Sequence, residues 1–264
     1  MSFAEVNGQR LHYRDTGGEG PVLVFSHGLL MDGSMWEPQI EELRGQYRCV
    51  SWDERGHGQT ESDGEPFTYW DSADDLLALL GHLGVKRATL IGMSQGGYLT
   101  QRAAVKAPEL IEGLVFVESQ SRPEDPEKAG QYQLLVEAWA ENGLGDELAR
   151  TIAAIVIDPD WEGCNGWIEK WKLRETGAIR YVAEPLFNRE DFTGRLAELD
   201  FPALVIRGTN DLAISEDDAR TLADGLPQGS LEIIEGAAHG ANLTHPAEVN
   251  RMLREFLSRA APAR

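Results

Sequence analysis

The segment ATLIGMSQGGYLTQRAAVKA, residues 88–107, decides the fold of this 264-residue chain. It opens with a short apolar run at 88–91, typical of a buried strand, and continues into a helical stretch. Between the two, residues 92–96 (GMSQG) match the pattern G-x-S-x-G. A serine between a strand and a helix predicts a turn so sharp that only small residues fit two positions to either side. We therefore expect Ser94 to adopt a strained backbone conformation above the carboxyl ends of parallel strands.

Strands and helices alternate on both sides of this segment. Short apolar runs predict further buried strands at 22–25, 47–52, 114–117, 203–206 and 231–234. Helices are expected between them, and this alternation indicates right-handed βαβ units. The sequence therefore predicts the α/β class, with a mostly parallel twisted sheet and helices on both faces.

Turn and capping residues place the edges of several elements. Asn7-Gly8 predicts the turn of a β-hairpin over 2–15, because both turn positions need positive φ. A capping box at 34–37 predicts the start of a helix, and Ser72 is expected to cap the next one.

The pattern changes between about 121 and 199, where helical stretches and turns occur and no buried strand is predicted. The simplest organisation is an α/β core formed by 1–120 and 200–264. Residues 121–199 are then a helical cap inserted into this core.

The charge balance narrows the range of partners. Lys and Arg number 24 against 44 Asp and Glu, which gives a net charge of −20. Such a surface repels phosphate backbones and anionic lipids, so binding to nucleic acids or membrane surfaces is disfavoured. The expected partner is a small molecule.

The two cysteines, Cys49 and Cys164, have neither the spacing of metal ligands nor the number that a disulfide framework needs. Residues 1–6 lack the basic and apolar regions of a secretion signal, and no apolar run approaches ~18 residues. We expect a cytoplasmic protein that uses no metal and no organic cofactor.

A serine hydroxyl is a weak nucleophile and needs a base within hydrogen-bond reach. Among six histidines, His239 fits best, because its small-residue loop follows the last predicted strand at the same sheet edge as Ser94. Asp211 follows the strand at 203–206 and can hold His239 in the productive tautomer. Glu118, after an earlier strand, is the rival acid, and the chain order Ser, Asp, His favours Asp211. The plainer alternative is that Ser94 only caps a helix.

These motifs resemble the α/β-hydrolase superfamily over nearly the whole chain outside the cap. The matching pieces are His27-Gly28, Asp53-x-Arg55-Gly56-x-Gly58, Gly208-x-x-Asp211 and Gly236-x-x-His239. The resemblance implies a triad of Ser94, Asp211 and His239, with an oxyanion hole formed by the backbone N–H groups of Leu29 and Gln95. Many members carry Met or Leu where this chain has Gln95, whose amide is expected to add polarity beside the site.

A serine at this turn implies acyl transfer through a covalent acyl-enzyme. Residues 31–36 and 53–58 also resemble 3-oxoadipate enol-lactonases and haloperoxidase/perhydrolase-like esterases, so we predict hydrolysis of an ester or lactone of a small, largely apolar molecule. Trp139, Trp161 and Trp167 are expected to line the substrate pocket, although they can equally hold the cap on the core. A small-molecule receptor or slow hydrolase, a perhydrolase and a carbon–carbon bond hydrolase are the alternatives.

Overall fold

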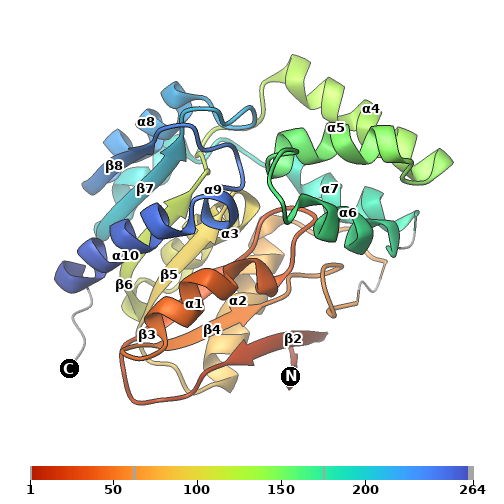
Figure 1. Ribbon diagram of the computed structural model, residues 1–264. Coiled ribbons are helices and arrows are strands. Elements are labelled where there is room, and N and C mark those ends of the chain that lie inside the picture. The colour runs from red at the N-terminus through yellow and green to blue at the C-terminus, as the bar shows by residue number, and fades with distance from the viewer. Residues whose placement is uncertain (1, 62–63, 175, 261–264) are drawn as a thin grey trace.

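The computed structural model describes residues 2–61, 64–174 and 176–260, and within them eight strands form one sheet (Figure 1). The strands are β1 (Ser2–Val6), β2 (Gln9–Asp15), β3 (Val22–Ser26), β4 (Arg48–Trp52), β5 (Ala88–Met93), β6 (Ile111–Val117), β7 (Pro202–Gly208) and β8 (Gln228–Ile234). They lie in the order β1-β2-β4-β3-β5-β6-β7-β8. The pairs β1/β2 and β2/β4 are antiparallel and the other neighbours are parallel, which confirms the predicted sheet.

Helices cover both faces of the sheet and bury two apolar cores. The helices of the α/β part are α1 (Glu37–Leu43), α2 (Tyr69–His82), α3 (Gln95–Lys106), α8 (Glu216–Gly225), α9 (Ala241–Thr244) and α10 (Pro246–Ala260). Apolar side chains of α1 and α10 pack against one face, and those of α2, α3 and α8 pack against the other. The central strands β3, β5, β6 and β7 are buried over most of their length and are largely apolar, which is the pattern that made them predictable.

Two helix starts differ from the sequence prediction. The segment at 34–37 is not a capping box: Asp32 accepts the Ser34 N–H at 2.9 Å and caps a 3-10 turn, Gly33–Trp36, that leads into α1. Helix α2 is capped by Thr68 rather than Ser72, because Thr68 and Asp71 form a reciprocal capping box. Helix α2 therefore begins where the Thr68 side chain satisfies a free N–H group of the first turn, whereas α1 continues from the 3-10 turn without a side-chain cap of its own.

A group of helices occupies the chain between β6 and β7. These are α4 (Pro126–Asn142), α5 (Asp146–Val156), α6 (Cys164–Lys172) and α7 (Ala178–Asn188). They lie together at one end of the sheet in Figure 1, in green to turquoise. None of the helices in the described ranges combines the length and the apolar character that a membrane crossing requires.

Candidate active site

Ser94 stands at the junction of β5 and α3 with φ 50° and ψ −115°, in the left-handed region that side chains rarely adopt. The turn is held by the Ser94 N–H, which donates to the Val117 carbonyl at 2.9 Å. It is also crowded: a Cβ on Gly92 would overlap the Gly96 carbonyl, and one on Gly96 would overlap the Ser26 carbonyl. The small residues of the motif are therefore required by backbone approaching backbone.

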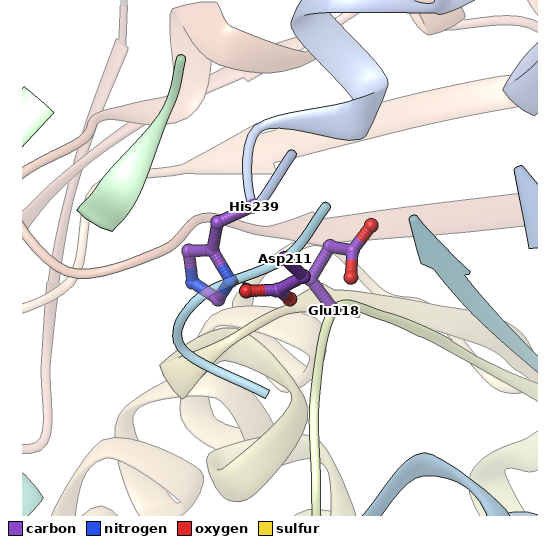
Figure 2. A group of neighbouring side chains, drawn as sticks. All are labelled: Glu118, Asp211 and His239. Carbon is purple, nitrogen blue, oxygen red and sulfur yellow. Dashed lines mark hydrogen bonds and ion pairs between the residues drawn. The ribbon is translucent and has the colours of Figure 1, made fainter. Parts of the chain in front are cut away.

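His239 and Asp211 come from the loops after β8 and β7, and their side chains pair (Figure 2). His239 Nδ1 lies 2.9 Å from Asp211 Oδ2, and both side chains are at least 95% shielded from solvent. Asp211 Oδ1 accepts the N–H groups of Ala213 at 2.7 Å and Ile214 at 3.0 Å. Burial opposes ionisation of Asp211, but the pairing with His239 and these hydrogen bonds lower its pKa to about 2. An ionised Asp211 fixes the proton of His239 on Nδ1 and leaves Nε2 as the free base.

Glu118 lies beside this pair and does not replace Asp211 as the partner of His239. One carboxylate oxygen of Glu118, one of Asp211 and one ring nitrogen of His239 lie within 4.8 Å of one another. This spacing could also hold a metal ion. The ring nitrogen nearest to Asp211 is used in the hydrogen bond between them. The arrangement is therefore a buried histidine–carboxylate pair with a second carboxyl group beside it.

Leu29 and Gln95, the predicted oxyanion donors, flank the nucleophile. Gln95 is the first residue of α3, and Leu29 lies in the loop after β3. Neither N–H donates a hydrogen bond to any residue that the structure describes, so both are available to a ligand. This is the condition that an oxyanion hole must meet.

The Gln95 side chain does not add polarity to the site, contrary to expectation. It is buried, and it turns away from Ser94: its amide Nε2 donates to Glu54, and its Oε1 lies 3.5 Å from the Tyr69 hydroxyl. In the loop after β3 that carries Leu29, His27 Nδ1 lies 2.8 Å from the Gly28 carbonyl oxygen. The other ring nitrogen, Nε2, accepts the Glu54 N–H at 2.9 Å. Glu54 therefore ties together the two segments that carry the candidate donors.

An apolar cavity of about 80 Å³ opens above Ser94 and His239. Its walls include the loop after β3 and residues of α4, α5 and α7, among them Leu29, Met31, Leu135, Val136, Ile152 and Leu186. Besides Ser94 and His239, the polar side chains among the described residues of its wall are Tyr98, Tyr132 and Glu124. Such a cavity suits a small, mainly apolar ligand with one reactive polar group.

The three tryptophans assigned to the pocket have different positions. Trp139 is buried and lines the cavity. Trp167 lines a separate groove, where the Lys170 ammonium lies 4.0 Å from its ring centre. Trp161 is partly buried against the core beside Gly163 and is not among the residues that line the Ser94 cavity. A tryptophan-rich composition cannot show these directions, since they depend on which side of each helix the ring occupies.

The sequence did not single out Tyr98, which lines the Ser94 cavity, or Trp171, which contacts the loop after β3. Tyr98 lies one helical turn after Ser94, and burial raises its pKa to about 12, while Arg189 and hydrogen bonding to Gln120 and Ser94 oppose the rise. Its position four residues after Ser94 was a usable signal, because such residues share one side of a helix. Trp171 donates through Nε1 to the Leu30 carbonyl at 2.9 Å, which joins α6 to the loop that carries Leu29.

The fold and this site define a class of protein. The family model for the alpha/beta hydrolase fold matches residues 21–246, and the chain belongs to this family.

Individual relatives are more distant and differ in what their names say they act on. The chain is 28% identical to a protein of Agrobacterium fabrum named as the carbamate hydrolase RutD, over 92% of this chain and 95% of that protein. It is 28% identical to 3-oxoadipate enol-lactonase 2 of Acinetobacter baylyi, over 94% of this chain and 93% of that protein. Among solved structures, a thermophilic esterase from Thermogutta terrifontis superposes with a TM-score of 0.86 at 27% identity, covering 96% of this chain and 94% of that one. The relatives are hydrolases, and they support a hydrolase activity for this chain.

Proposed function

We propose that this chain is a serine hydrolase that cleaves a carboxylic ester or lactone of a small, largely apolar molecule through an acyl-enzyme. The observation that carries the proposal is the pairing of His239 with Asp211 at the wall of the cavity that also contains Ser94. Esterase and enol-lactonase relatives point to the same bond type.

The residues divide the reaction between them. His239 Nε2 takes the proton of Ser94 as Oγ attacks the substrate carbonyl, while Asp211 stabilises the imidazolium that forms. The N–H groups of Leu29 and Gln95 receive the developing oxyanion, and such donors are typically worth about 3 kcal/mol each. His239 then gives its proton to the leaving alcohol. The same base activates a water that releases the acid.

The lining of the cavity indicates the size and polarity of the substrate. We infer that 121–199 act as a cap, since residues of α4, α5 and α7 form much of the wall. Glu124 is paired with Arg189 at 3.2 Å, so this carboxylate offers little charge to attract a cationic ligand. An apolar acyl or alcohol group is therefore favoured over a charged one.

The first test is steady-state hydrolysis of short- and medium-chain p-nitrophenyl esters. We expect multiple turnovers by the native chain and a loss of at least about a thousandfold in Ser94→Ala, since the nucleophile is removed. Ser258→Ala is the matched control, because it deletes the same hydroxyl from an exposed position on α10. Its kcat should equal that of the native chain.

A second measurement addresses the covalent step. Mass spectrometry of a rapidly acid-quenched reaction should find the acyl group on the peptide that contains Ser94. If Ser94→Ala turns over esters as fast as the native chain, Ser94 is not the nucleophile. Tight binding with at most about one hydrolysis per molecule would favour a receptor instead.

A further inference from the structure

Glu118 is a second buried acid next to the Asp211–His239 pair (Figure 2), and the reaction above leaves it without a role. It follows β6 directly, with a φ of 46°, and its side chain is fully shielded from solvent. Oε1 accepts the Gly208 N–H at 2.7 Å. Oε2 is also buried, and no described residue donates a hydrogen bond to it. A buried oxygen without a donor needs either a proton of its own or a partner.

The nearby carboxylate of Asp211 is the reason to expect a proton on Glu118. One oxygen of Glu118 and one of Asp211 lie within 4.8 Å of each other and of a His239 ring nitrogen. Two buried carboxyl groups this close do not both carry a negative charge. From the residues that the structure describes, Asp211 accepts three hydrogen bonds, two from backbone N–H groups and one from His239, whereas the side chain of Glu118 accepts one, from Gly208. Since donors favour the ionised form, the charge belongs to Asp211 and the proton to Glu118.

The electrostatic environment agrees with this division. Burial raises the pKa of Glu118 well above its ordinary value, and the charge of Asp211 raises it further. The guanidinium of Arg207 acts in the opposite direction but contributes less. Hydrogen bonding from Glu118 also contributes to the low pKa of Asp211.

We propose that Glu118 is a positioning residue: as a neutral carboxylic acid it donates a hydrogen bond to Asp211 and holds this carboxylate towards His239. The inference rests on the proposed function, because it takes Asp211 and His239 in the roles given there. With donors on several sides, Asp211 cannot rotate away from the ring, and it stays ionised while His239 carries the proton. Glu118 itself does not exchange its proton in the reaction.

Two variants separate a neutral donor from an ionised acid. Glu118→Gln keeps a donor of similar shape, and we expect its kcat to stay within about threefold of the native value. Glu118→Leu keeps the volume but removes the donor, and we expect kcat to fall about 10- to 100-fold, the cost of a lost hydrogen bond to a charged group. KM should change little in both, since Glu118 is not among the residues that line the cavity.

Two spectroscopic readouts need no substrate. Infrared difference spectra between the native chain and Glu118→Gln should show the loss of one carbonyl band of a protonated carboxylic acid near neutral pH. The low-field proton resonance of His239 Nδ1–H should shift in Glu118→Leu and stay in place in Glu118→Gln. If the native chain hydrolyses no ester, the proposed function fails, and these spectra still decide the protonation and positioning of Glu118.

The opposite results are equally clear. If Glu118→Gln loses as much activity as Glu118→Leu, a neutral donor is not what the site needs, and the inference is overturned. It is also overturned if both variants match the native chain, or if no carboxylic-acid band disappears. Should Glu118→Leu fail to fold, the glutamine variant and its infrared spectrum carry the test alone.

Discussion

Glu54 is a single buried residue that links the stability of the fold to pH. It accepts a hydrogen bond from the Gln95 amide, and its N–H donates to His27 at 2.9 Å. Burial raises its pKa to about 8, and the charge of Asp75 adds to this rise, while hydrogen bonds from Ser72 and Gln95 oppose it. Near neutral pH the folded chain therefore holds Glu54 mostly as the neutral acid.

The sign of the pH effect follows from this raised pKa. Unfolded, Glu54 ionises near its ordinary value of 4.5, whereas folded it ionises near 8. Its contribution to stability is therefore complete below about pH 4.5 and is lost as the pH rises to about 8. Between these values the free energy of unfolding should fall more steeply in the native chain than in Glu54→Gln. The slopes should differ by up to about 1.4 kcal/mol per pH unit.

Urea denaturation of both proteins at pH 5, 6, 7 and 8 measures this difference. Glutamine retains an acceptor and a donor of the same shape, so the contact with Gln95 can persist in the variant. Parallel slopes in the two proteins would show that Glu54 is ionised in the folded chain at these pH values.

Among the candidate site residues, the sequence predicts those that belong to a local motif. It does not predict residues whose role depends on contacts with parts of the chain that are distant in sequence. Ser94, Asp211 and His239 each follow a predicted strand with a recognisable loop, so their shared sheet edge could be derived. The role proposed for Glu118 could not, because its contacts with Gly208 and Asp211 exist only once β6 and β7 pair.

The turn between β5 and α3 leaves no room for a larger residue at Gly96. A Cβ at position 96 would overlap the backbone carbonyls of Ser26 and His27, which cannot move without shifting β3. We expect Gly96→Ala to lower the free energy of unfolding by about 1–3 kcal/mol, the usual cost of overpacking. Ester hydrolysis should fall as well, since Ser94 and the Gln95 N–H move with the turn.

Gly45→Ala is the matched control for this substitution. Gly45 is exposed, has no positive φ and has no atom within 4 Å of the point where a Cβ would lie, so the added methyl meets open space. Urea midpoints and kcat of the two variants give the comparison. Equal midpoints for Gly96→Ala and the native chain would show that the turn is not packed as tightly as the structure describes.

Element boundaries were less predictable than element types. Short apolar runs identify the central strands β3, β5, β6 and β7, because burial on both faces leaves little room for polar residues. The start of α2 depends on whether Thr68 or the later Ser72 reaches the free N–H groups, and sequence spacing allows either choice. Helix α1 follows a 3-10 turn that Asp32 caps, which the spacing does not show. The sequence also does not show why Trp139 and Trp167 line different cavities, because this depends on how each helix is rotated about its own axis.

At the scale of the whole molecule, the net charge of −20 sets a response to salt. Repulsion among like charges destabilises the compact state, and the screening length falls from about 30 Å at 0.01 M salt to about 8 Å at 0.15 M. Exposed ion pairs such as Arg180–Glu137 lose strength at the same time, but each is worth at most about 1 kcal/mol. We therefore expect the urea midpoint to rise over this range of sodium chloride concentration. A midpoint that falls would show that ion pairs outweigh the repulsion.

The strand order of the sheet also determines when activity can first arise in a newly made chain. The candidate nucleophile follows β5, its acid follows β7 and its base follows β8, so the chemistry draws on strands far apart in the sequence. A ribosome-bound chain that has not yet released β8 contains Ser94 but no base to activate it. Pairing of parallel strands distant in sequence is slow. During refolding, ester hydrolysis should therefore return only when β8 pairs with β7 and brings His239 to the sheet edge. Until the sheet is complete, the chain should show no hydrolysis.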